Sequence, residues 1–251
     1  MLHYLRNIRK KLIIQENVKK YLLYAIGEIF LVVIGILIAL QINNWNEARK
    51  LRASEQNILQ NLKSELIINL EQLEIYQNIH LGEYRDGIFL LNLFGTDVSS
   101  LSVSKLDSTL GNIETNFTFE ANDGYIKSLI ASGKIDHLQN VELKSLLTSF
   151  DGMVIDATQE NEPIQRLLHE RLWPAIDGKI NSLNRIRIYE GYSDFPTGSY
   201  TSDYHWFFSS REMEDVVSNI TSWKQSIVID ERSFKEKIDQ MILLVENEIE
   251  H

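Results

Sequence analysis

The sequence contains no cysteine and only three prolines among its 251 residues. The lack of cysteine excludes disulfides, thiolate metal sites and cysteine nucleophiles. Because proline interrupts helices, its scarcity leaves room for long ones. Apolar residues recur at three- and four-residue spacing over much of the chain, which is the pattern of amphipathic helices. We therefore expect an all-α fold.

Recognisable catalytic and cofactor-binding patterns are also missing. No glycine-rich phosphate loop, nucleophile elbow or His-Glu-x-x-His helix occurs. Metal sites in helical bundles use Glu-x-x-His pairs, whereas this chain has only the reversed His80-x-x-Glu83. Asp203 beside His205 is the best remaining candidate for a catalytic pair. We expect no catalytic residue, metal or cofactor, and an enzyme with an unrecognised site is kept as an alternative.

One segment, Tyr21–Ile42, is long and apolar enough to cross a bilayer. Residues 29–40 within it carry no polar side chain. Tyr21 and Trp45 lie near its two ends, where aromatic rings favour the membrane interface. The core helix of a soluble protein and a cleaved signal peptide are the alternatives. No small-x-small cleavage site follows the apolar run, so an uncleaved anchor is the better interpretation.

Charge is distributed unevenly around this segment. Residues 1–20 carry six basic side chains and one acidic one, and an excess of Lys and Arg marks the cytoplasmic side. Residues 43–251 carry 33 acidic and 19 basic side chains, which disfavours nucleic acid as a partner. We expect a cytoplasmic tail (1–20), a transmembrane helix (21–42) and a periplasmic helical domain (43–251) of a single-pass inner-membrane protein.

Glu28 is the unusual residue of the span. At 100° per residue, Glu28 shares a helix face with Gly35 and Ala39, and Tyr24 extends that face. Small residues let helices approach closely, and intramembrane polar residues face partners or pathways. We expect the lipid bilayer and either a second copy or another membrane protein as partners of the span. Glu28 is then structural, or proton-carrying in an ion-coupled complex, or extended toward the interface.

Residues 46–81 indicate one long helix that continues almost directly from the span. Its apolar residues recur at helical spacing from Ile58 to Tyr76. We expect this stripe to lie in the core of a helical bundle, with a seam between copies as the alternative. A strict coiled coil is disfavoured, because Asn69 and His80 would lie in its seam.

Capping residues mark several shorter helices. Ser104 is expected to begin one, with Asp107 completing a capping box. Gly133 is expected to end another in the left-handed conformation, and Asn140 to cap the next. The predicted helices after the long one are 83–94, 104–110, 123–132, 141–160, 210–222 and 233–250. Pro163 either kinks the helix 141–160 or restarts it, and the apolar face continues from Ile164 to Ile176.

The segment Tyr189–Phe208 is expected to be an irregular loop, because it contains two glycines and Pro196. It also holds eight aromatic residues. Aromatic side chains dominate binding hot spots, so a partner or ligand surface is one interpretation. The alternative is that the segment caps the end of the helix bundle. The residues selected as a possible binding surface are Tyr192, Tyr200, Tyr204 and Trp206.

The run YLLYAIGEIFLVVIGILIALQINNWNEARK resembles the opening of an uncharacterised family of single-span envelope proteins from Bacteroidota. The shared features are GE inside the span and IALQINNWNE leading out of it. The run FEANDGYIKSLIASGKIDHLQNVELKSLLTSF resembles that family's helix–SG–helix segment. The resemblance implies membrane anchoring and a helical outer domain, and it brings no activity. Our hypothesis is a non-enzymatic envelope protein that binds a partner or ligand.

Overall fold

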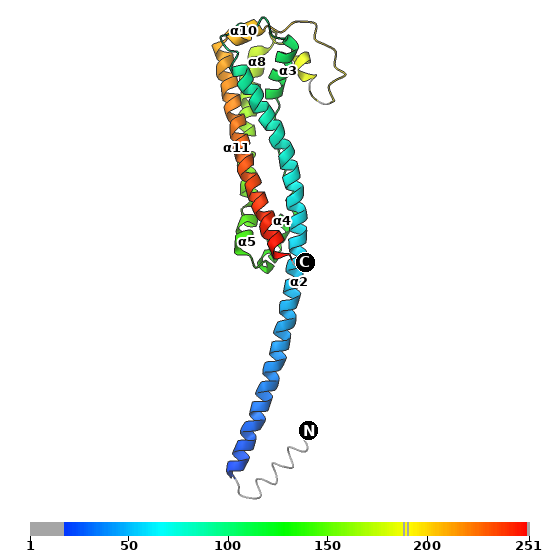
Figure 1. Cartoon of the computed structure of the whole chain (residues 1–251), viewed down its shortest axis with the longest axis vertical. Coiled ribbons are helices and arrows are strands. Elements are labelled where there is room, and N and C mark those ends of the chain that lie inside the picture. The colour runs from blue at the N-terminus through cyan, green and yellow to red at the C-terminus, as the bar shows by residue number, and fades with distance from the viewer. Residues whose placement is uncertain (1–17, 188, 190, 250–251) are drawn as a thin grey trace. The chain divides into compact units, whose positions relative to one another are not determined.

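The computed structural model describes residues 18–187, 189 and 191–249. Every regular element in that part of the chain is a helix, which confirms the all-α prediction. The two long helices are α2 (Val18–Leu91) and α11 (Arg211–Glu248) (Figure 1). The shorter elements are α3 (Val103–Ile113), α4 (Gly124–Ala131), η1 (Lys134–His137), α5 (Val141–Thr148), α6 (Phe150–Asp156), α7 (Asn161–Leu167), η2 (Leu168–Leu172), α8 (Trp173–Ile176), α9 (Ser182–Ile186) and α10 (Tyr204–Ser209).

The chain divides into two compact units, Met1–Gln56 and Asn57–His251. The first unit holds the apolar part of α2, and the large apolar side chains of residues 22–42 are all exposed. One helix in the described part of the chain is thus long and apolar enough to cross a membrane. Most of the predicted basic tail, residues 1–17, lies outside the described residues. The predicted membrane boundary at residues 42 and 43 stays a prediction.

The second unit has two hydrophobic cores, and both long helices contribute to each of them. One core combines Leu90 of α2 with Ile220 of α11, while α3, η2 and α10 pack around them. The other combines Leu66 of α2 with Ile238 of α11, while α4 and α5 cover them. Each fully buried Leu or Ile stabilises the fold by about 1.5–3 kcal/mol through its removal from water. The two ends of the unit are therefore each held by their own apolar contacts.

Helix α2 does not break between residues 81 and 83, so the prediction of two helices there is wrong. The helix continues because it has a buried face on both sides of that point and no proline. Gly87 has a separate role where α2 meets α11. A Cβ atom at Gly87 would collide with the side chain of Thr221, so glycine permits the close approach of the two helices.

Helix α11 is likewise continuous, whereas the sequence predicted separate helices at 210–222 and 233–250. The polar residues Lys224 and Glu231 lie between the two predicted helices. Both side chains are buried in the fold. The face of α11 that carries these two polar residues therefore points into the interior of the unit.

Two of the predicted capping residues are confirmed, and one is wrong. Asn140 accepts a hydrogen bond from the Leu143 amide at 2.9 Å, and Gly133 has a φ of +70° after α4. The cap of α3 is Ser102, which accepts from the Lys105 amide at 3.4 Å, rather than Ser104. The predicted helix 141–160 is divided at Ser149 into α5 and α6.

Candidate functional site

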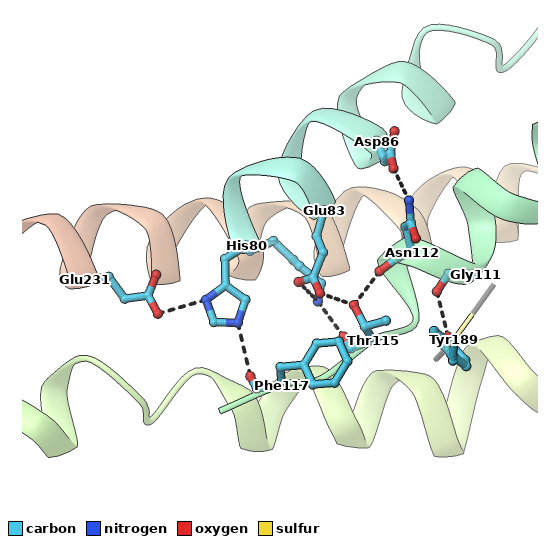
Figure 2. A network of polar contacts seen from close by, with 10 residues as sticks. His80, Glu83, Asp86, Gly111, Asn112, Thr115, Phe117, Tyr189 and Glu231 are labelled. Carbon is cyan, nitrogen blue, oxygen red and sulfur yellow. Dashed lines mark hydrogen bonds and ion pairs between the residues drawn. The ribbon is translucent and has the colours of Figure 1, made fainter. Parts of the chain in front are cut away.

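A layer of four buried charged side chains, His80 and Glu83 of α2 with Lys224 and Glu231 of α11, links the two long helices (Figure 2). Lys224 of α11 donates to the Glu83 carboxylate of α2 at 2.6 Å and to the Thr115 carbonyl at 2.6 Å. His80, one helical turn before Glu83, lies 2.8 Å from the Glu231 carboxylate. The four charged side chains are nearly inaccessible to solvent and form two pairs of opposite sign. Charge is therefore balanced across the layer, as burial requires.

The surroundings of His80 favour its charged form. Its Nδ1 atom faces the Glu231 carboxylate, and its Nε2 atom lies 3.1 Å from the Phe117 carbonyl oxygen. Both neighbours are acceptors, and an imidazolium ring can donate to both of them. Burial lowers the pKa of His80, but the hydrogen bond and charge of Glu231, assisted by Glu83, outweigh burial and raise it.

Two further buried polar residues of α2 hold the first turn of α4 and the segment before it. Glu65 accepts from the Tyr125 and Ile126 amides, each at 2.9 Å. Asn69 donates to the Asn122 carbonyl at 2.7 Å and accepts from the Asn122 amide at 2.8 Å. The polar positions that made a coiled-coil seam improbable are therefore anchoring points within the unit.

A cavity of about 470 Å³ is lined by residues that belong to α8 and α9 or adjoin α3, α8 and α9. Such a volume is within the range of small-molecule sites. Its lining joins charged and aromatic side chains from segments far apart in the sequence. The residues are Glu114, Trp173, Asp177, Arg185, Tyr189 and Tyr192.

Glu114 and Arg185 form a buried ion pair on the cavity wall. Arg185 donates through Nη1 to one carboxylate oxygen of Glu114, and the Trp173 indole donates to the other at 3.3 Å. Burial raises the pKa of Glu114 to about 7, although Arg185 and Trp173 act to lower it. Shifted carboxyl pKa values of this kind occur at functional sites and also in structural ion pairs.

Buried Asp107 positions the helix that carries Arg185. Its carboxylate accepts from Asn184 of α9 at 3.2 Å, from the Ser202 hydroxyl at 2.6 Å and from the Tyr204 hydroxyl at 2.8 Å. The expectation that Asp107 completes a capping box is therefore wrong. The cavity wall is held by an interior hydrogen-bond network rather than by exposed loops.

The span residues selected from the sequence lie as follows. Tyr24 and Glu28 are partly exposed, whereas Gly35 and Ala39 are exposed. Trp45 is 65% exposed, and the Arg49 guanidinium lies over its ring at 5.5 Å. Tyr21 belongs to α2, but its side chain lies outside what the structure describes.

The aromatic segment is divided between core and surface. Residues Tyr204–Ser209 form α10, so the expectation of a loop over this part is wrong. Tyr204 is buried, and Trp206 is partly exposed with the Lys179 ammonium 3.7 Å from its ring. Tyr200 is 84% exposed, and Tyr192 lines the cavity. Part of the segment thus closes the bundle, and part borders the candidate site.

Two weaker candidates have structural roles. Asp203 caps α10 by accepting from the Trp206 amide at 2.9 Å. His80 and Glu83 each pair with a different residue of α11. Among the described residues, no group of three or more His, Asp or Glu side chains is placed to hold a metal ion.

The core of the candidate site was not selected from the sequence. Glu114 follows α3, Trp173 begins α8 and Arg185 belongs to α9. No short motif links these positions, because 71 residues separate Glu114 from Arg185. Of the four residues selected as a possible binding surface, Tyr192 lines this cavity.

The comparisons with known proteins identify a family without a known activity. A family model described as a family of unknown function (DUF6090) matches residues 28–154, just over half of the chain. The match begins inside the span and ends in α6. No curated protein and no solved structure matches the chain. The chain therefore belongs to the family of unknown function DUF6090.

Proposed function

We propose that this protein is a membrane-anchored, non-enzymatic binding protein whose helical unit acts outside the cytoplasm. The observation that carries the proposal is the exposed apolar stretch of α2. None of the side chains in its most apolar window is buried. Exposed apolar surface of this extent is unfavourable in water and favourable in lipid. The second unit has its own cores and a cavity, as a binding domain requires.

The proposed orientation rests on the basic residues before the span. A reporter enzyme that is active only in the periplasm should be active when it is fused after His251. Alkaline carbonate washing should leave the full-length chain in the membrane pellet. Recovery in the wash would contradict the anchor, and activity of only a cytoplasmic reporter would contradict the orientation.

We also propose that the span associates with a second copy or with another membrane protein. Support comes from the face that contains Glu28, Gly35 and Ala39, because a Cβ atom at Gly35 would have no neighbour within 4 Å. The small residues Gly35 and Ala39 would let a second helix approach closely along this face. Affinity purification from native membranes should recover either the tagged and untagged copies together or a distinct membrane protein.

A further inference from the structure

Aromatic side chains form much of the cavity wall. Trp173, Tyr189 and Tyr192 contribute the rings. The ring planes of Tyr189 and Tyr192 stand at 79° to each other, with their centroids 6.3 Å apart. The Tyr189 hydroxyl donates to the Gly111 carbonyl at 2.8 Å, which holds this ring in place (Figure 2). Because the face of an aromatic ring is electron-rich, a cavity bounded by several rings attracts a cation.

The charged residues of the lining also favour a cation. Glu114 and Arg185 form a buried pair whose charges oppose each other. Asp177, the remaining charged residue of the lining, is exposed and has no hydrogen bond or ion pair with a described residue. Lys179 does not line the cavity, and its ammonium lies over the Trp206 ring, 3.7 Å from the centroid. A ligand cation therefore meets one carboxylate that has no counter-charge of its own.

The hydrogen-bonding groups of the lining favour a cation without N–H groups. A primary ammonium has three donors, and each donor that is buried without an acceptor costs free energy. The Glu114 carboxylate is already engaged by the Arg185 guanidinium and the Trp173 indole. A quaternary ammonium has no hydrogen to donate, and proteins recognise it through aromatic cages.

We propose that the cavity binds a small quaternary ammonium ligand, with the cation against the rings of Trp173, Tyr189 and Tyr192 and near the Asp177 carboxylate. This assignment rests on the proposed binding function and names its ligand class. Binding is non-covalent, so no bond forms or breaks. The same cation occurs in free solutes such as choline and in the phosphocholine headgroups of lipids, and both present the same chemistry to the rings.

The test compares two ligands of nearly the same shape, with full-length protein in maltoside micelles. Choline has a charged nitrogen at the centre of its three methyl groups, and dimethylbutanol has a neutral carbon at that place. Isothermal titration calorimetry at about pH 8, above the pKa of about 7 of Glu114, should show saturable binding of choline. Choline should bind at least about tenfold tighter than dimethylbutanol, because the rings and the carboxylate attract only the cation. Heats measured with empty micelles are subtracted.

Glycerophosphocholine distinguishes the two sources of the cation. It carries the same trimethylammonium group together with the phosphate of a lipid headgroup. Tighter binding of glycerophosphocholine than of choline would assign a lipid headgroup as the ligand, and weaker binding would assign a free solute. Either result supports the ammonium site.

Variants locate the cation. Asp177→Asn removes the carboxylate and should weaken choline binding by about threefold or more, without changing the affinity for dimethylbutanol. Asp194→Asn is the matched control, since Asp194 is also exposed but does not line the cavity, and its affinity for choline should stay within about twofold. Tyr192→Leu removes a ring and should weaken choline binding by about threefold or more. Tyr192→Phe keeps the ring face, so its affinity should stay within about twofold.

Several results would overturn the assignment: no saturable choline binding, equal affinity for choline and dimethylbutanol, equal losses in Asp177→Asn and Asp194→Asn, or equal losses in Tyr192→Leu and Tyr192→Phe. Circular dichroism of each variant verifies that it is folded. Membrane anchoring is measured separately by carbonate washing. Loss of anchoring would contradict the proposed function and leave the ligand site, and absent choline binding in an anchored chain would do the reverse.

Discussion

Helix α2 contains two stretches that differ in the exposure of their apolar side chains. In residues 22–42 the large apolar side chains are exposed on all sides. In residues 58–90 the apolar side chains Leu62, Leu66 and Leu73 are fully buried on one side. The first pattern suits a helix surrounded by lipid, and the second suits a helix on a protein core. One continuous secondary-structure element therefore carries signals for two environments.

Polar residues sharpen the difference between the two stretches. Within 58–90, each buried polar side chain among Glu65, Asn69, His80 and Glu83 has a hydrogen-bond partner from another segment of the unit. Within the span, Glu28 is the single acidic residue. The comparison indicates that a charge is tolerated in α2 where the fold supplies a counter-charge.

The largest expected effect comes from breaking a charge pair in the second stretch. Lys224→Ala leaves the Glu83 carboxylate buried without its cation and should lower the free energy of unfolding by about 3–5 kcal/mol. Urea denaturation followed by circular dichroism measures the loss. Lys237→Ala, at an exposed position of the same helix, should change stability by less than about 0.5 kcal/mol. Equal losses of stability in the two variants would mean that the buried charge pair contributes no more than an exposed lysine.

The next prediction compares the same substitution, to arginine, in each of the two stretches. Val32 and Ile75 are similarly exposed, at 58% and 60%. Val32→Arg should disfavour membrane insertion by about 2.5–3.5 kcal/mol, because the new charge lies near the centre of the span. Ile75→Arg should be nearly neutral. The fraction of chain that resists carbonate washing is the measurement, and equal fractions for the two variants would contradict the difference in environment.

A pH-dependent effect should follow from His80. Its folded pKa is raised above 6.5, so the stabilisation is complete below about pH 6.5 and is lost as pH rises through the folded value. Glu114 acts in the same direction at lower pH, between 4.5 and about 7. Burial lowers the pKa of Lys224, which acts in the opposite direction, so the prediction concerns the difference between the two chains. In urea titrations upward from about pH 7, the stability of the natural chain should change more steeply downward than that of His80→Gln. The same slope in both would contradict the pairing with Glu231.

The smallest expected effect concerns association of the span. Gly35→Leu should weaken it by about 1 kcal/mol through steric block, whereas Val33→Leu on another face should not. Energy transfer between labelled chains in vesicles measures the difference. If the two variants behave alike, the face containing Glu28 is not a seam.

Glu28→Gln then tests whether the carboxyl group must ionise. The substitution keeps size and hydrogen bonding but removes ionisation. Association and cellular phenotype that both survive would assign a structural role. Loss of phenotype with intact association would favour the ion-coupled alternative.

The sequence predicts helix ends correctly where the capping interaction involves neighbouring residues. Asn140 and Gly133 act at helix ends through hydrogen bonds and backbone angles within a few positions. Ser104 failed as a cap because Ser102, two residues earlier, takes that role. Lys224 lies between the helices predicted at 210–222 and 233–250, and its partner Glu83 is 141 positions away. Nothing in the local pattern reveals a partner at that distance.

By itself, the sequence determined the helical class, the apolar stretch of α2 and membership of an uncharacterised family. These properties follow from composition and from periods of three to four residues, which are local. Only the tertiary structure decided that α2 and α11 are continuous, that their charges meet in a buried layer, and that Glu114, Trp173 and Arg185 surround one cavity. The physical reason is that burial and pairing depend on which distant segments pack together, and packing is a property of the whole unit.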